Sequence, residues 1–423
     1  MAVPAFSAGL EYETFMVTTA QDHGPGSLRA AVIAANQSAK PGIIKFDSSE
    51  SGFASPRTIY LENPLPPLVG ELTIDGSISN RLWTSTGATI SANMKFPVFQ
   101  VDPDAQVTLQ AITIANGNNE RGGGVVNWGA LVVKGVTFMA NRADEDGGAL
   151  ANLGGTIQLI NSTFIDNQAG SRGGGFANSE GQATVTNCTF SGNSASQAGA
   201  LFNAAELLLR NTVLANSEGE SDCHSLKPLA GGSNNNLIES NVGCGTPLSS
   251  SDPKLGTLGY FNGPAKTIPL NGGSPAINMG DNSSALDESG QPLRWDQRGS
   301  GDPRFVAGYT DIGAFEYQVF PKLEVDVIDD VELRSCTSSS RSDCSLRGAL
   351  AVANAMGKEA TIRFNRKLFS TPQTIRLKEP LPEIVVKLVL DGSATAGVTI
   401  AGSLEVNPGT GALTLNKVTI KKE

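Results

Sequence analysis

Carboxylates and arginines gather in one turn-rich stretch of the chain, from Asp252 to Glu316. Among them are Asp281, Asp287, Asp296, Asp302, Asp311, Glu316, Arg294, Arg298 and Arg304. Such carboxylates can bind calcium, and a suitably spaced pair can act as acid and base in sugar hydrolysis. The interleaved arginines favour a third interpretation, a network of Arg–Asp pairs that holds an irregular segment. Its main candidates are Asp281, Asp296, Arg298, Asp311 and Glu316. Neither an EF-hand spacing nor a GGxGxD repeat is present in the sequence.

The five cysteines predict two short-range disulfides and one free thiol. Cys223 and Cys244 bracket a Gly/Asn-rich loop, and Cys336 and Cys344 bracket the polar stretch TSSSRSD. Loop-rich pairs of this kind are typical of proteins from an oxidising compartment. Cys188 lies in a strand-like segment, and we expect a buried thiol there.

Histidine offers little for catalysis or metal binding, because the chain has only His23 and His224. The run from Asp222 to His224 lacks the paired ligand spacing of a zinc site. Three adjacent acids, Asp144 to Asp146, fall in a turn, where a solvated charged loop is the ordinary interpretation. We assign no catalytic residue and expect no cofactor; calcium is the one ion that the carboxylates suggest.

An internal repeat of about 25 residues must position these groups. Its strand-like segments begin at Val107, Leu131, Ile157, Thr184 and Leu207, with Gly-rich turns between them. Apolar and polar residues alternate within each segment, which predicts strands and argues against a helical solenoid. Short strands and glycine turns at this period predict successive coils of a parallel β-helix, in which equivalent residues stack about 4.8 Å apart.

Two residue types recur in phase with this repeat. Phe138, Phe164 and Phe190 are 26 residues apart, which predicts a stack of rings in the core. An asparagine follows each glycine cluster, at Asn127, Asn152, Asn178 and Asn203, and we expect their amides to bond to one another in a ladder.

A second asparagine series follows the aromatic positions, at Asn141, Asn167, Asn193 and Asn216. For the asparagines we favour a structural role in the turns over contact with a carbohydrate. The Asn-x-Thr sequences at Asn161 and Asn187 fall on the same repeat. We interpret them as packing positions rather than glycosylation sites.

The opening of the chain recurs near its C-terminus. GSLRAAVIAAN from Gly26 matches CSLRGALAVAN from Cys344, and TIYLENPLPPL from Thr58 matches TIRLKEPLPEI from Thr374. Each opening contains a short apolar helix, with Ser27 or Ser345 as its N-cap. Because a β-helix exposes strand edges at its ends, we expect these helices to cap the stack.

These repeats divide the chain into four parts. Residues 1–100 form a cap and the first coils, 101–220 the regular coils, 221–320 an irregular segment, and 321–423 the opening of a second unit. The final strand, LTLNKVTI from Leu413, is followed by no further coil. We favour continuation in a longer protein, and the alternative is head-to-tail association through this open end.

Composition limits the partners. With 31 basic and 41 acidic residues the net charge is −10, which argues against nucleic acid or an anionic membrane as a partner. Apolar runs long enough to span a bilayer are absent from the sequence. Three tryptophans and five tyrosines leave few rings for stacking on sugars.

Two stretches resemble known bacterial sequences. CSLRGALAVANA and GSLRAAVIAAN resemble the CSLREA motif found near the start of β-helix surface proteins. The series GSPAI, DQRG and DIGAFE, within residues 252–316, is similar to the choice-of-anchor Q domain. Two departures are Gly348, where the motif has Glu, and Asn278, where Asp is common. The resemblance implies a right-handed parallel β-helix that is secreted or attached to the cell surface, and it brings no established catalytic centre.

Three functions therefore remain open from the sequence. We favour an extracellular structural or adhesive protein, one link of a longer repetitive chain, with polysaccharide or other surface proteins as partners. The alternatives are a polysaccharide lyase or hydrolase of the pectate-lyase type and a non-catalytic carbohydrate-binding module. The enzyme alternative rests on an analogy of fold alone.

Overall fold

The computed structural model describes residues 11–49, 52–53, 55–77, 87–261, 263–306, 308–317, 323–333, 342, 344–356 and 359–421. Parallel strands and two short helices form a β-solenoid of about 14 turns, so the predicted fold class is confirmed. Its right-handedness stays a prediction. The chain forms two compact units: unit 1 is Met1–Arg304 with Thr310–Tyr317, and unit 2 is Phe305–Tyr309 with Gln318–Glu423.

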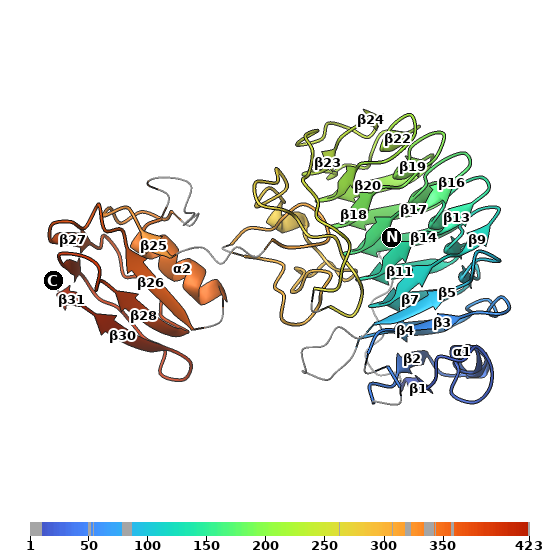
Figure 1. The fold of residues 1–423 in the computed structure, drawn as a ribbon, viewed down its shortest axis with the longest axis horizontal. Coiled ribbons are helices and arrows are strands. Elements are labelled where there is room, and N and C mark those ends of the chain that lie inside the picture. Colours follow the sequence, from blue (N-terminus) through green and yellow to red (C-terminus); the bar gives the residue numbers. More distant parts are fainter. Residues whose placement is uncertain are drawn as a thin grey trace. The chain divides into compact units, whose positions relative to one another are not determined.

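Unit 1 is built from three parallel sheets that run along the stack of coils (Figure 1). The largest has 13 strands: β1 (Glu13–Val17), β2 (Gly42–Phe46), β4 (Glu71–Asp75), β6 (Phe99–Val101), β7 (Gln106–Gln110), β10 (Val125–Asn127), β11 (Ala130–Lys134), β14 (Leu150–Ile160), β17 (Phe176–Thr186), β19 (Leu201–Asn203), β20 (Glu206–Arg210), β22 (Cys223–Ser225) and β24 (Asn241–Val242). The second has eight: β3 (Arg57–Tyr60), β5 (Ala88–Ser91), β8 (Thr113–Ala115), β12 (Thr137–Met139), β15 (Thr163–Ile165), β18 (Thr189–Ser191), β21 (Val213–Ala215) and β23 (Leu237–Ile238). The third is small: β9 (Asn118–Asn119), β13 (Arg142–Ala143) and β16 (Gln168–Ala169).

The core of unit 1 follows from alternation along each strand. Leu131 pairs with Val107 on one side and Ile157 on the other, and all three side chains are buried. Because the register is the same from coil to coil, each apolar side chain packs on a similar one from the next coil. The result is one continuous hydrophobic core.

Left-handed backbone conformations form the turns between the first and second sheets. Asn161, Asn187 and Asn211 have φ values of 46°, 49° and 46°, and Gly135 occupies the preceding coil at 60°. Asparagine and glycine tolerate this conformation better than other residues do, which explains their recurrence at this position.

Helix α1 (Leu28–Gln37) lies beside β1 and β2 at the N-terminal end of the stack (Figure 1). The Ser27 hydroxyl accepts a hydrogen bond from the Ala30 N–H, so the predicted N-cap is present. Leu28, Val32 and Ala35 are buried against the first coils. The helix therefore covers apolar side chains at this end of the core.

Unit 2 repeats the opening of unit 1 with a hydrophobic core of its own. Helix α2 (Leu346–Met356) accompanies a four-stranded sheet and a three-stranded sheet. The strands are β25 (Glu324–Val325), β26 (Ala360–Phe364), β28 (Lys387–Asp391) and β30 (Ala412–Asn416), then β27 (Gln373–Arg376), β29 (Val398–Ala401) and β31 (Val418–Lys421). Ser345 caps α2 through a hydrogen bond from the Gly348 N–H.

An irregular segment of unit 1 packs on the outer face of its second sheet (Figure 1). We call residues 252–261, 263–304 and 310–316 the strap. Its regular structure is limited to the 3-10 turn η1 (Asn282–Ser284) and isolated bridges among the residues described. Leu270, Ala276 and Ile312 of the strap form a small core with the outward side chains Val213 and Leu237.

Candidate functional site

The three predicted phenylalanines form a stack at the centre of unit 1. The ring centroids of Phe138 and Phe164 are 4.6 Å apart, and those of Phe164 and Phe190 are 4.2 Å apart. The rings are within 8° of parallel, and all three side chains are fully buried. Ile114 and Leu214 continue this column on either side. The column is a packing element without a polar group to offer a ligand.

Asn127, Asn152, Asn178 and Asn203 form a ladder of side-chain amides. Each Nδ2 donates to the Oδ1 of the next asparagine, at 2.8, 2.9 and 2.8 Å. Asn203 continues the ladder to the Ser225 hydroxyl at 2.9 Å. The amides also satisfy turn carbonyls, and all four residues are buried. Buried amides cannot contact a carbohydrate in solution, so the geometry supports the structural interpretation.

The second asparagine series contains one error of register. Asn141, Asn167 and Asn193 form a buried ladder, with Nδ2–Oδ1 distances of 2.9 and 2.9 Å. Asn216, assigned to this series from the sequence, lies one position away from it. The bridge between Ser194 and Glu218 aligns Asn193 with Ser217 instead. Asn216 takes a left-handed conformation with φ of 57°, and the interval of 23 residues rather than 26 was the warning.

The Asn-x-Thr asparagines hold the strap against the coils. The Nδ2 of Asn161 donates to the Trp295 carbonyl at 2.8 Å, and that of Asn187 to the Asp311 carbonyl at 3.1 Å. Asn211, in the next coil, donates its Nδ2 to the Asp281 carbonyl at 2.9 Å. Its Oδ1 accepts a hydrogen bond from the Asp281 N–H at 2.8 Å. The side chains of this column therefore recognise strap backbone. A glycan on Asn161 or Asn187 would occupy the place of the strap.

A column of outward threonines lies under the same strap. The hydroxyl of Thr163 donates to Gln297 Oε1 at 2.5 Å, and the N–H of Ala314 donates to the Thr189 hydroxyl at 2.9 Å. Thr137 donates to the Lys266 carbonyl and accepts from Gln297 Nε2. Gln297 thus bridges two coils. No pattern in the sequence pairs these threonines with residues more than 100 positions away.

The predicted charge network is present beneath the strap's surface. Arg298 contacts the Asp296 carboxylate through Nε and Nη2, at 2.9 and 2.6 Å from Oδ2, and Asp302 through Nη1 at 3.0 Å. Its guanidinium also lies 3.9 Å from the centroid of the Phe315 ring. The Glu316 N–H donates to Asp296 Oδ2 at 2.8 Å. These contacts tie two distant parts of the strap together.

A second buried arginine, Arg304, completes the network. It donates to the carbonyls of Gly313 and Ala314 at 2.9 and 2.7 Å, and lies 3.5 Å from Glu316 Oε2. Arg304, Asp311 and Glu316 are fully buried. Burial raises the pKa of Asp311 to about 6, against the opposing effect of N–H groups from Asn278 and Tyr317. Burial, and then the charge of Asp311, raise the pKa of Glu316 well above its usual value.

The five network candidates do not converge on one ion site. Asp296, Arg298, Asp311 and Glu316 lie together, with arginines and backbone N–H groups as partners. Asp281 instead caps η1 and accepts from Asn234. Asn278 has φ of 59° and donates its N–H to Asp311 Oδ1 at 2.6 Å. The arrangement suits a structural clamp better than calcium.

The acidic turn at residues 144–146 differs from the solvated loop that we expected. Asp144 is exposed, but Asp146 is buried and makes two bonds to Arg172, at 2.9 and 2.6 Å. Glu145 pairs with Arg121 from the preceding coil. Successive coils are therefore joined by ion pairs at this corner. The pairing of Asp146 with Arg172 was not evident from the sequence, because Arg172 follows one full repeat later.

One predicted disulfide is confirmed. Cys223 and Cys244 are bonded, and their Cα atoms are 6.2 Å apart. Cys188 is a free, buried thiol, and burial raises its pKa to about 12, so it is a poor nucleophile. Cys336 lies outside the described residues, and the pair Cys336–Cys344 stays a prediction.

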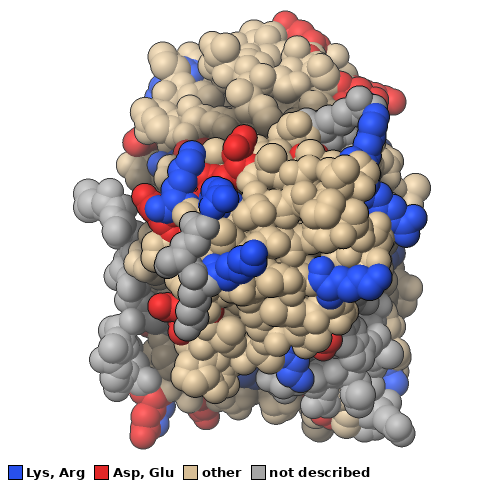
Figure 2. All heavy atoms as spheres, turned by 90° about the vertical axis from the view of Figure 1, so that its left-hand side faces the viewer, with Lys and Arg blue, Asp and Glu red and all other residues tan. Residues whose placement is uncertain are grey.

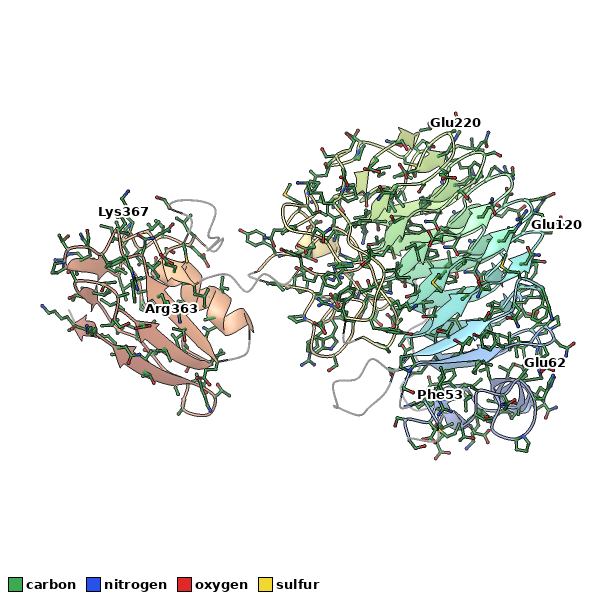
Figure 3. The ribbon with its side chains drawn as sticks, viewed as in Figure 1. Phe53, Glu62, Glu120, Glu220, Arg363 and Lys367 are labelled. Atoms are coloured by element: carbon green, nitrogen blue, oxygen red, sulfur yellow. A yellow bond between two sulfur atoms is a disulfide. The ribbon has the colours of Figure 1, made fainter. Side chains whose placement is uncertain are left out.

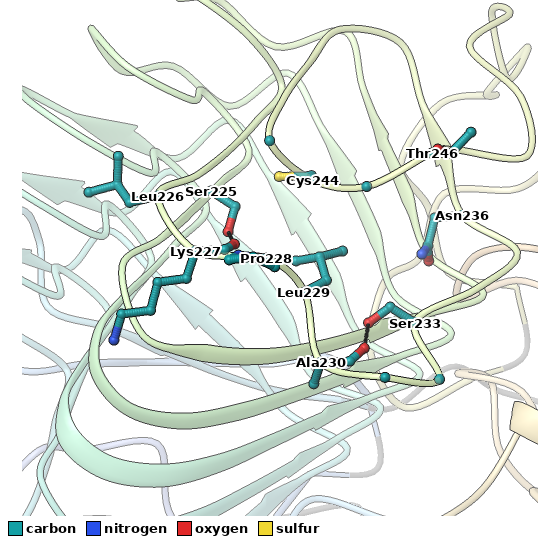
Figure 4. Close-up of a pocket in the computed structure, with 14 residues that line it drawn as sticks. Ser225, Leu226, Lys227, Pro228, Leu229, Ala230, Ser233, Asn236, Cys244 and Thr246 are labelled. Carbon is teal, nitrogen blue, oxygen red and sulfur yellow. Dashed lines mark hydrogen bonds between the residues drawn. The ribbon is translucent and has the colours of Figure 1, made fainter.

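An open cavity of about 660 Å³ lies beside the confirmed disulfide (Figure 4). Leu226, Pro228 and Leu229 supply its apolar lining, and Lys227 its one charged side chain. Hydrogen bonds from Ser225 to the Lys227 carbonyl and from Ser233 to the Ala230 carbonyl stiffen the loop. None of the lining residues described is aromatic, which disfavours stacking on a sugar ring.

Sequence reasoning missed two side chains that fasten each helix. Arg29 donates to the carbonyls of Asn63 and Pro64 and to the Asp22 carboxylate, and Asn36 donates to the Pro67 carbonyl. In unit 2, Arg347 and Asn354 make the matching bonds, which go to Glu379, Pro380, Asp330 and Glu383. The Ser-Leu-Arg and Ala-Asn sequences, which both copies of the opening share, could have indicated this clamp.

Among the described residues, no helix combines the length and the apolar character that crossing a membrane requires. Figure 2 shows a face of the molecule on which Lys and Arg side chains are dispersed, several of them beside Asp and Glu. A continuous basic patch, which a nucleic-acid partner would favour, is not visible on this face.

The chain was compared with known proteins at three levels. No family model, no curated protein and no solved structure matches it. The geometry of the solenoid and its strap is therefore the basis for a functional proposal.

Proposed function

We propose that this chain is a secreted or cell-surface protein with a structural or adhesive role, one link of a longer repetitive extracellular protein. The finer assignment, to right-handed β-helix proteins of the CSLREA-motif and choice-of-anchor Q type, belongs to the same proposal. It rests on the motifs quoted above and on a fold that agrees with them.

The observation that carries the proposal is the repetition of one solenoid opening in two units. Both units start with a capped helix, an Asp–Arg pair and an Asn anchor, followed by parallel coils. Each has its own hydrophobic core. Tandem units with separate cores suit a modular rod, because each link can fold without the others.

The buried polar groups support a structural rather than a catalytic role. The asparagine ladders, the threonine column and the strap's arginines satisfy other parts of the same chain. The disulfide Cys223–Cys244 supports folding in an oxidising compartment.

The location is tested by protease treatment of intact cells that produce the protein. Strap and loop peptides should be released from intact cells, whereas a cytosolic marker should be released only after lysis. Release of both only after lysis would contradict the proposed location. A purified chain that depolymerises cell-wall polysaccharides would instead support the enzyme alternative.

The proposed partners are extracellular polysaccharide, other surface proteins, or a second copy of the chain. Self-association would use strands β30 and β31, which lie at the edges of the two sheets of unit 2. Leu415 of β30 is 39% exposed there. Light scattering over a concentration series, with and without residues 322–423, tests this contact. A monomer at every concentration in both forms would exclude it.

A further inference from the structure

Three potential metal ligands meet beside α1 in unit 1. His23 Nε2 lies 3.1 Å from Asp22 Oδ2 and 3.5 Å from Glu62 Oε2. One ligand atom from each residue lies within 4.8 Å of the other two. Among the described residues this is the only group of three or more His, Cys, Asp or Glu side chains that could hold a metal ion. Figure 3 shows Glu62 close to the helix.

The two separations measured from His23 are close to the edges of a coordination shell. Ligands about 2.0–2.2 Å from a tetrahedral ion are roughly 3.3–3.6 Å from each other. The two distances from His23 fall at or near this range. The Asp22 side chain is 1% exposed and is held by Arg29, so one ligand is fixed in advance. The side chains of His23 and Glu62 are 50% and 73% exposed, which leaves them free to adjust and leaves room for water ligands.

A comparison with unit 2 shows that this triad is not part of the clamp that holds the helix. Asp330 accepts from Arg347 and from the Lys378 N–H, just as Asp22 accepts from Arg29 and from the Glu62 N–H. The clamp therefore needs neither the imidazole nor the second carboxylate. Val331 follows Asp330 where His23 follows Asp22, and Lys378 stands where Glu62 stands. His23 and the Glu62 carboxylate are additions to unit 1 that the clamp does not explain.

We propose that Asp22, His23 and Glu62 bind one Zn²⁺ ion. An imidazole with two carboxylates suits zinc, whereas calcium prefers a shell made wholly of oxygen atoms. Two carboxylates and the Arg29 guanidinium leave one net negative charge to attract the cation. The imidazole nitrogen that would bind the ion is His23 Nε2, which lies close to both carboxylates.

The ion would join two segments that are distant in the sequence. Asp22 and His23 precede α1, and Glu62 follows β3. A bound ion would therefore fasten the N-terminal helix to the first coils, beside the bonds from Arg29 to Asn63 and Pro64. Zinc would stabilise unit 1 by mass action, because the unfolded chain does not hold these groups together.

The test titrates ZnCl₂ into the full chain, with any purification tag removed, by calorimetry at neutral pH. We expect one ion per chain and a rise in the thermal midpoint. His23→Gln and Glu62→Gln should each weaken zinc binding at least tenfold while the apo thermal midpoint stays near that of the parent. His224→Gln is the matched control, because it removes the only other histidine, and it should leave binding unchanged.

Histidine NMR provides the direct readout. The chain has two histidines, so the His224→Gln variant assigns both imidazole spectra. Zinc should shift the ring signals of His23 and leave those of His224 in place. Binding that persists in His23→Gln, or a shift confined to His224, would overturn the proposal. A titration without heat and without a shift in either ring would overturn it equally.

Discussion

Phe164 has a phenylalanine ring on each side, and Asn152 has an asparagine amide on each side. Residues in these columns are defined by their neighbours one coil away rather than by their neighbours in sequence. A substitution there changes contacts with two coils at once. The environment of a residue also determines its ionisation. Asp311 and Glu316 are ionisable groups that are fully buried and out of contact with water.

Phe164→Ala should destabilise unit 1 by about 3–5 kcal/mol, because it removes a buried ring and leaves a cavity between two others. Asp144→Ala, which truncates an exposed side chain in a nearby turn, is the control. Thermal and denaturant unfolding of the two variants provides the measurement. Equal shifts for both would contradict the stacked register.

Asp311 should make unit 1 less stable as the pH rises from about 4 to about 6. Its pKa is raised to about 6 in the folded state, so the folded chain keeps a proton that the unfolded chain has lost. This stabilisation is complete below the pKa of Asp311 in the unfolded chain. It is lost as the pH rises through the pKa of Asp311 in the folded chain. The effect should be on the order of 2–3 kcal/mol.

Thermal unfolding of the parent and of Asp311→Asn across this range provides the measurement. The parent should lose stability relative to the variant as pH rises. A difference between them that does not change with pH would show that Asp311 does not titrate there. Asp281 has the opposite effect on the pH dependence of stability, because hydrogen bonds lower its pKa. Its contribution changes at a pH below this range.

At the scale of elements, the coils follow from the sequence and the strap does not. The period and the alternation of apolar residues predicted parallel coils, because each coil repeats the same local pattern. The strap has no period, and its contacts join residues such as Asn161 and Trp295, 134 positions apart. The strap buries the side chains of Thr163 and Thr189, which project from the outer face of the second sheet. The arginines beside the carboxylates identified the buried network, but not the surface on which it lies.

Asn211→Ala should loosen the strap. It removes two hydrogen bonds to the Asp281 backbone, at a cost of about 1–3 kcal/mol, and places alanine at φ of 46°. Asn216→Ala is the matched control, because Asn216 has a similar φ of 57° and donates to Ser191 instead of the strap. Limited proteolysis should cut residues 252–304 faster in Asn211→Ala than in the control. Equal rates would show that the asparagine column does not hold the strap.

At the scale of the whole molecule, the cysteines and the two cores define how the chain should unfold. Mass spectrometry of the unreduced protein should find Cys223 bonded to Cys244 and Cys336 bonded to Cys344. Cys188 should react with thiol reagents only after denaturation, because it is buried. Reduction should lower the stability of unit 1 by about 3 kcal/mol, as expected for a loop of 21 residues. A bridge to Cys188 would contradict the placement of its strand.

Calorimetry should resolve two unfolding transitions, because the two units have separate hydrophobic cores. Phe164→Ala should move one transition and leave the other in place. Leu390→Ala, in β28 of unit 2, should do the reverse. A single transition that both variants shift equally would show that the units unfold together.

The strap also decides how unit 1 would respond to a pulling force. The chain leaves this unit at Tyr317, from the strap, and not from the last coil near Val242. A solenoid pulled from its last coil peels open one coil at a time, with a single row of bonds under load. Tension applied at Tyr317 would instead act on the strap, which is bonded to Asn161, Asn187 and Asn211 in three different coils. A link in an extracellular rod would gain mechanical strength from this attachment without a larger core.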